Sequence, residues 1–181
     1  MKRIADKLRK ENIAEYLIYM WQIEDLIRAN NCDIDTIKTN VIATFHVDER
    51  EKEEITEWYG NLVDMMRTEG VKEKGHLQIN KNILLELADL HANLLSTTRF
   101  PFYQAAYFKA LPFIVELRAK NQDKDSSDLE VCFEAMYGEL LLRLQKKPIT
   151  PDTQRAMDAI SSFLSLLANY YDKDCKNEIE W

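Results

Sequence analysis

The sequence is poor in the residues that interrupt regular structure. Only 4 glycines and 4 prolines occur in 181 residues, whereas glycine alone averages roughly 7% of ordinary proteins. Glycine supplies the positive-φ positions of hairpin turns, β-bulges and phosphate-binding loops. Its scarcity argues against a β fold. No P-loop, dinucleotide-binding glycine motif or Gly-x-Ser-x-Gly motif occurs in the sequence, which argues against the enzyme classes that use them.

Cysteines and long apolar runs are scarce as well. The three cysteines lie far apart, without a Cys-x-x-Cys pair, which suits a reducing compartment better than a disulfide framework. No run approaches the ~18 apolar residues of a transmembrane helix. The start of the chain is basic like that of a signal peptide, but Glu15, Gln22 and Glu24 interrupt the stretch that would have to be apolar. We therefore expect a cytoplasmic protein without a membrane partner.

Positive charge and metal-binding residues are also limited. With 24 Lys and Arg against 31 Asp and Glu, the net charge is −7. Nucleic-acid binding needs a concentrated basic face, so we expect no nucleic-acid partner. The three histidines are scattered. Glu73 and His76 have the Glu-x-x-His spacing of a di-iron bundle, but Gly75 lies between them and the spacing is read as chance. We predict no metal and no cofactor.

Apolar residues that recur every three or four positions dominate what remains, and this is the period of amphipathic helices. The pattern predicts an all-α fold, a single domain over residues 1–181 built as a bundle of about seven helices. We expect residues 1–5 to fray and residues 71–79 and 121–126 to form loops. The predicted helices cover residues 6–29, 34–45, 48–70, 81–97, 101–120, 127–147 and 151–174.

Short-range signals mark several of these helix ends. Asp33 and Asp48 are good N-cap residues, and Ser127 with Glu130 has the spacing of a capping box. Gly70 is a typical residue just beyond a helix end. These signals predict where the second, third and sixth helices begin and where the third helix ends.

The first predicted helix is apolar on nearly all sides, which is typical of a helix buried in the centre of a protein. Glu24 lies inside its apolar arc, and Arg28 follows at the i,i+4 spacing of an ion pair. His91 lies in the apolar stripe of the fourth predicted helix. One interpretation makes Glu24 and His91 an acid/base or ligand-binding pair with Arg28 nearby. The simpler interpretation, which we prefer, is that these are satisfied structural pairs.

Aromatic residues gather around the start of the fifth predicted helix, where six lie between residues 100 and 113. Arg99 stands just before this helix, whose N-terminus carries partial positive charge. Pro112 is expected to kink or split this helix, and one interpretation is a ligand pocket at the kink, with Tyr103 and Tyr107 as walls and Arg99 as an anion anchor. The preferred alternative is that these rings fill the core.

The segment Arg9–Ala29, RKENIAEYLIYMWQIEDLIRA, resembles the opening of a family of bacterial all-helical proteins that is a domain of unknown function. Two later segments, RFPFY from Arg99 and ELLLR from Glu139, are compatible with that family. The resemblance covers most of the chain and implies a cytoplasmic bacterial protein of one helical domain. The family has no assigned activity, so the resemblance carries over no catalytic residue. It places Glu24, Asp25 and Arg28 in the most distinctive part of the chain.

Two functional hypotheses follow from these patterns. The leading one is a non-enzymatic helical-bundle protein that acts through a protein partner or as a homodimer, because no catalytic constellation is present. The alternative is a small-ligand-binding protein or an enzyme of unrecognised type. Its candidate residues are Arg99, Tyr103 and Tyr107, together with Glu24, Arg28 and His91.

Overall fold

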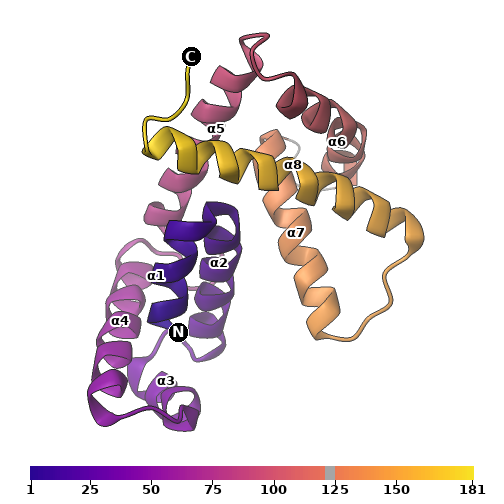
Figure 1. The fold of residues 1–181 in the computed structure, drawn as a ribbon. Helices are drawn as coiled ribbons and strands as arrows, with labels where there is room; N and C mark the ends of the chain where they lie inside the picture. The colour runs from indigo at the N-terminus through magenta and orange to yellow at the C-terminus, as the bar shows by residue number, and fades with distance from the viewer. Residues whose placement is uncertain (121–124) are drawn as a thin grey trace.

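The computed structural model describes residues 1–120 and 125–181. The described residues form helices without strands, which confirms the predicted all-α fold (Figure 1). Of the predicted loop at 121–126, residues 121–124 lie outside the described part of the chain. The elements are α1 (Lys2–Glu11), α2 (Ile13–Ala29), α3 (Ile34–Asn40), a 3₁₀ helix η1 (Ile42–Thr44), α4 (Glu49–Thr68), α5 (Gln78–Leu95), α6 (Pro101–Lys120), α7 (Asp128–Leu144) and α8 (Pro151–Cys175).

The first predicted helix is in fact two helices. Asn12 adopts an extended backbone, and its side-chain oxygen accepts hydrogen bonds from the amides of Ala14 and Glu15 at 3.1 and 3.2 Å. An asparagine in this role is an N-cap, so α2 starts afresh after α1 ends. The predicted helix over 34–45 likewise divides into α3 and η1.

The predicted caps of the other helices are present. The side chains of Asp33 and Asp48 accept hydrogen bonds from the first turns of α3 and α4. Ser127 and Glu130 form the predicted capping box of α7. Gly70 has a φ of +71° just after α4, a backbone conformation that glycine adopts without strain.

The helices are arranged as two groups joined through α2. In Figure 1, α1, α3 and α4 lie together with α2 at the lower left, and α8 lies across α5, α6 and α7. Contacts link α2 to α1 and α4 in the first group and to α5, α7 and α8 in the second. The prediction of a buried, central N-terminal helix is thereby confirmed, for α2 rather than for α1.

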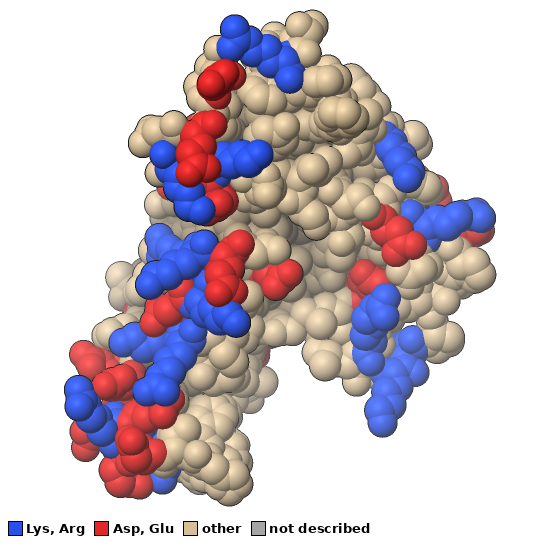
Figure 2. Space-filling view, in the orientation of Figure 1, with Lys and Arg blue, Asp and Glu red and all other residues tan. Residues whose placement is uncertain are grey.

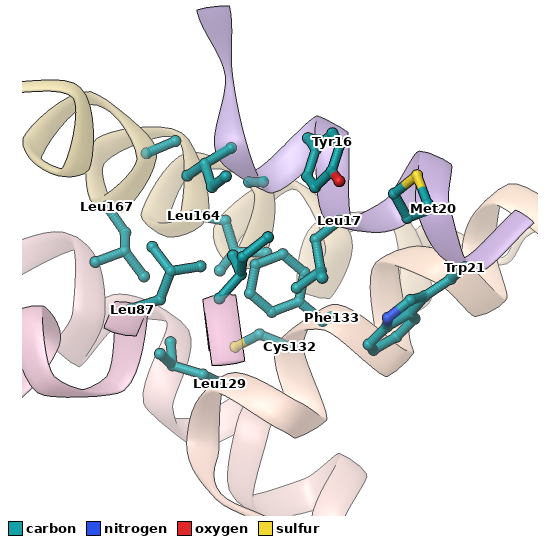
Figure 3. Close-up of a cluster of buried hydrophobic side chains, with 14 of the residues drawn as sticks. Tyr16, Leu17, Met20, Trp21, Leu87, Leu129, Cys132, Phe133, Leu164 and Leu167 are labelled. Carbon is teal, nitrogen blue, oxygen red and sulfur yellow. The ribbon is translucent and has the colours of Figure 1, made fainter. Parts of the chain in front are cut away.

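The core between the two groups is built mainly from α2, α5, α7 and α8 (Figure 3). Leu17 of α2, Leu87 of α5 and Phe133 of α7 are fully buried there. Such side chains are stabilised by removal of their apolar surface from water, by roughly 25 cal/mol per Å². Other members of the cluster are Tyr16, Met20, Trp21, Leu129, Cys132, Leu164 and Leu167.

Pro112 does not divide α6, which continues from Pro101 to Lys120 as one element. Proline removes one backbone hydrogen bond from a helix interior but does not always end the helix. None of the helices described here is long and apolar enough to cross a membrane.

Candidate functional site

Glu24 is the most deeply buried charged residue of α2, with 0% of its surface exposed. Its carboxylate accepts hydrogen bonds from the Leu77 amide at 2.9 Å and from Nδ2 of Asn80 at 2.7 Å. It also lies 2.6 Å from Nδ1 of His76 and 4.0 Å from Nη2 of Arg28. The carboxylate is therefore engaged by donors from α2, from the two residues before α5 and from the first turn of α5.

These contacts make Glu24 the cap of a helix distant from it in sequence. Leu77 is the N-cap residue of α5, but its apolar side chain makes no cap hydrogen bond. A helix N-terminus leaves backbone amides unpaired and carries partial positive charge, both of which a carboxylate satisfies. The neighbouring Gln78 amide is bound in the same way by Glu69, at 2.7 Å. The first turn of α5 is thus closed by acidic side chains from α2 and the end of α4.

His76 connects this buried carboxylate to the surface. Its ring stacks on Trp21 with centroids 4.1 Å apart and planes 13° from parallel, and one third of its side chain is exposed. An ionised carboxylate only accepts hydrogen bonds, so Nδ1 of His76 is the donor in this contact. Among the described residues no nucleophile is hydrogen-bonded to the ring.

Arg28 and Asp25 extend the cluster towards α7. Arg28 bonds Asp25 at 2.7 Å and donates to the backbone oxygens of Val71 and Gly75. Tyr137 of α7 donates its hydroxyl proton to Asp25 at 2.6 Å. The cluster therefore joins α2, the segment between α4 and α5, and α7.

The hypothesis that Glu24 and His91 form a pair is wrong. Glu24 meets the first turn of α5, and His91 lies 11 positions beyond Asn80 on the same helix, roughly 16 Å further along at 1.5 Å per residue. His91 instead bonds the hydroxyl of Tyr103 through Nδ1 at 2.6 Å. The predicted contact between Glu24 and Arg28 is present, at the outer limit of an ion pair.

A second polar cluster lies between α5, α6 and the start of α7. Tyr107 donates its hydroxyl proton to Asp128, and Arg118 bonds the same carboxylate. Burial would raise the pKa of Asp128, but these two hydrogen bonds and the guanidinium charge hold it below its usual range. Burial lowers the pKa of His91, and the Asp128 charge offsets this only in part. His91 is thus held neutral at physiological pH.

Arg99, Tyr103 and Tyr107 do not converge on one opening. Tyr103 is fully buried and Tyr107 nearly so, and both rings contact Phe163 of α8. Arg99 donates to the backbone oxygens of Glu180 and Trp181. The Trp181 ring lies edge-on to the Phe100 ring, with the two ring centroids 5.8 Å apart. The two tyrosines therefore lie in the core, whereas Phe102 and Phe108 of the same aromatic group are exposed, and Arg99 holds the C-terminal segment.

The opposite side of α6 carries a feature that the sequence reading missed. Six apolar residues follow one another at spacings of four and three positions, and each is exposed. We call these residues the outer stripe; they are Pro101, Ala105, Phe108, Pro112, Val115 and Ala119. Phe102 beside them is 82% exposed, Phe108 is 59% exposed and Val115 is 53% exposed.

Charge is distributed unevenly over the face of the molecule shown in Figure 2. Acidic and basic side chains are densest at the lower left, where Figure 1 places α1, α3 and α4, and others lie along the left edge up to the top and at the right edge, while the centre of this face is mostly uncharged. Within α6 only Lys109, Glu116, Arg118 and Lys120 are charged. The six residues of the outer stripe are themselves uncharged, and Lys109 and Glu116 lie beside them on the same helix.

Comparison with known proteins identifies a family. A family model described as a domain of unknown function, DUF4924, matches residues 2–178. The chain belongs to this family. No curated protein and no solved structure matches it. In this DUF4924 protein, the described residues include no group of three or more His, Cys, Asp or Glu placed to hold a metal ion.

The DUF4924 match confirms the resemblance drawn from the Arg9–Ala29 segment, while a bacterial and cytoplasmic origin stays a prediction. Sequence reasoning identified Glu24, Asp25 and Arg28 but dismissed His76, the residue that Glu24 binds most closely. No signal for this contact was present in the sequence, because Asn80, a good N-cap residue, stands directly before the predicted helix over 81–97. In the structure α5 begins earlier, at Gln78, and its N-cap residue Leu77 makes no side-chain hydrogen bond.

Proposed function

We propose that this protein acts through contact with another protein and that the outer stripe of α6 is the contact surface. The observation that carries this proposal is the exposure of six apolar residues in an unbroken row. Single exposed apolar residues are normal on protein surfaces, whereas contiguous patches usually mark an interaction site. The polar clusters, by contrast, are occupied by contacts within the chain.

The alternative, a ligand pocket at Arg99, Tyr103 and Tyr107, has less support. The two tyrosine rings already pack on α8, and their hydroxyl groups bond His91 and Asp128. A ligand would have to displace these contacts before it could use the same groups. We therefore place the function on the exposed side of α6 rather than on its buried side.

Photo-cross-linking in cells that naturally make the protein tests the proposal. A photoreactive phenylalanine at position 108 should give a discrete cross-linked species, and Val115→Glu should abolish it. The same probe at Leu85 of α5, which is 61% exposed and lies outside the outer stripe, is the matched control. Equal, diffuse labelling from positions 108 and 85 would contradict the proposal.

The folding contribution of the stripe is measured separately. Phe108→Glu should lower the free energy of unfolding by no more than ~1.5 kcal/mol, because the side chain is 59% exposed and loses mainly its ring contact with Tyr107. Urea denaturation measures this. A loss of several kcal/mol would show that Phe108 is needed for the fold and would remove it from the proposed surface.

A further inference from the structure

We propose that the partner of the outer stripe is a second copy of this chain, with the two α6 helices antiparallel about a twofold axis at Pro112. This inference rests on the proposed function, which names the surface but leaves the partner open. Three observations support a second copy: the spacing of the stripe, its symmetry about Pro112, and the charges along one edge.

The spacing of the stripe suits helix-to-helix packing. Its residues alternate in steps of four and three positions from Pro101 to Ala119. At about 100° per residue they stay within a narrow arc of α6, as the contact positions of paired helices do. A partner helix laid along α6 can therefore contact the stripe over its full length.

The stripe is also matched to itself. When two antiparallel helices cross at Pro112, Ala105 of one copy faces Ala119 of the other, both seven positions from the crossing point, and Phe108 lies within one position of Val115. Small residues then oppose small ones and large residues oppose large ones. A twofold interface requires such self-complementarity, because the same patch serves both copies.

The charges beside the stripe select the antiparallel arrangement. Lys109 and Glu116 are both exposed, and at 100° per residue they lie on the same edge of α6. Antiparallel pairing brings equivalent edges together, so Lys109 of each copy meets Glu116 of the other. Parallel pairing would instead bring the edge with Gln104 and Leu111 against them, so that neither charge meets an opposite charge across the interface and Glu116 keeps only its ion pair with Lys120 of the same helix. Opposite charges across an interface fix register in this way.

The expected dimer is weak. A 20-residue helix such as α6 is about 30 Å long, and packed helices lie about 10 Å apart. Contact through α6 alone therefore falls below the roughly 800 Å² per partner of a standard interface. With a net charge of −7 on each copy, a dissociation constant on the order of 100 µM is expected.

Charge reversal tests the pairing by sedimentation equilibrium of the full chain at low salt, from about 10 to 500 µM. Lys109→Glu and Glu116→Lys should each weaken the dimer about five- to tenfold, because each turns two attractive pairs into repulsive ones. The double variant should restore wild-type affinity. Equal weakening by the double variant would overturn the antiparallel pairing, even where a dimer persists.

Cysteine cross-linking tests the orientation independently, in a Cys175→Ser background because Cys175 is exposed. Ala105→Cys combined with Ala119→Cys should give a disulfide-linked dimer, and neither single variant should. In the antiparallel dimer two copies of position 105 lie 14 positions apart along the helices, roughly 21 Å. A cross-link from Ala105→Cys alone would show parallel pairing and overturn the proposal.

The two proposals fail differently. A wild-type chain that stays monomeric to 500 µM, while position 108 cross-links to a different protein in cells, would overturn the second copy as partner and support the proposed function. A monomeric chain without any specific cross-link from position 108 would overturn both. A cross-linked species with the mass of two chains, whose yield falls with Lys109→Glu and returns in the Lys109→Glu, Glu116→Lys double variant, would support both.

Discussion

The helices α4 and α6 have the same length, 20 residues, and each buries one side in the core, yet their outer sides are opposite in chemistry. Every exposed residue of α4 is polar or charged, as in Glu53, Glu57 and Asp64. The exposed side of α6 is a row of apolar residues. The comparison teaches that α4 is adapted to water on its outer side, whereas α6 is adapted to a second apolar surface.

The two helices also differ in the hydrogen bonding of a buried tyrosine. Tyr59 of α4 and Tyr103 of α6 are both fully buried. The Tyr103 hydroxyl bonds His91, whereas the Tyr59 hydroxyl has no partner among the described residues. The interior beside α6 is therefore organised by specific polar bonds, and the interior beside α4 by packing alone at this point. The following variants test how far this contrast extends.

The largest change in the free energy of unfolding is expected at Glu24 of α2, the helix that joins the group containing α4 to the group containing α6. Glu24→Gln should lower the free energy of unfolding by about 2–4 kcal/mol, because an amide removes the buried charge and turns a donor towards other donors. Glu139→Gln on α7 is the matched control, since that carboxylate is also buried but, within the described part of the chain, is bonded by the half-exposed Arg143 alone. It should cost about 1 kcal/mol or less. If both variants lower the free energy of unfolding equally in urea denaturation, then Glu24 is no more important to the fold than an ordinary buried ion pair, which would contradict its role between the two groups of helices.

The next effect sharpens the contrast between the two tyrosines. Tyr103→Phe should lower the free energy of unfolding by about 1–1.5 kcal/mol, because it breaks a bond and leaves His91 with an unpaired nitrogen. Tyr59→Phe removes a hydroxyl that has no partner and should be neutral or slightly stabilising. The pair is measured side by side by urea denaturation. Similar losses for the two variants would show that Tyr59 has a partner in solution.

A smaller effect is expected from pH. The folded-state pKa of His91 is lowered by burial, so the unfolded chain binds more protons at mildly acidic pH, below the ordinary value of about 6.5. Stability linked to His91 is therefore complete above pH 6.5 and is lost as pH falls below it. His91→Gln should lose less stability than the wild type between pH 7.5 and 5.5. Parallel pH profiles for the two proteins would contradict this assignment.

Between pH 7.5 and 5.5, Asp128 does not contribute to the change in the free energy of unfolding. Its folded-state pKa is lowered, so the stability it contributes is present above its unfolded value of about 3.9 and is lost only below that value. A difference between wild type and His91→Gln above pH 5 therefore reports on the histidine. Loss of the Asp128 contribution would follow at stronger acidity.

The smallest global effect is expected at Arg99. Its guanidinium group binds the backbone oxygens of Glu180 and Trp181 at the surface, so Arg99→Ala should change the free energy of unfolding by no more than ~0.5 kcal/mol. The local effect should be clear: amides of residues 176–181 should exchange hydrogen faster. Arg155→Ala, which removes an exposed ion pair on α8, is the control and should leave these amides unchanged.

Features decided by neighbouring residues were predictable from the sequence. The caps at Asp33, Asp48 and Ser127 lie where they were expected because a cap bonds an amide two or three positions away. Asn12 has the same chemistry but was overlooked, since apolar residues keep their helical period on both sides of it. A periodic pattern shows which side of a helix is buried but does not show where one helix gives way to another.

Features decided by distant residues were not predictable. Glu24 was recognised as unusual for its place in an apolar arc, but its partner His76 is 52 positions away. Whether Glu24 contacts His76 or His91 depends on the axial position of α5 relative to α2, and helix periodicity does not determine this position. The exposure of the outer stripe could not be predicted for a similar reason. A helix that is apolar on two sides gives no signal for which side will face the core until its neighbours are in place.

The capping of α5 by Glu24 has a consequence for the order of folding. A helix closed by its own N-cap can form its first turn as soon as a few neighbouring residues are fixed, whereas this turn depends on a carboxylate 53 positions earlier in the chain. Nucleation of the first turn is the costly step of helix formation. We therefore expect the start of α5 to become structured only when α2 docks against it, so that the two halves of the protein fold together rather than one after the other.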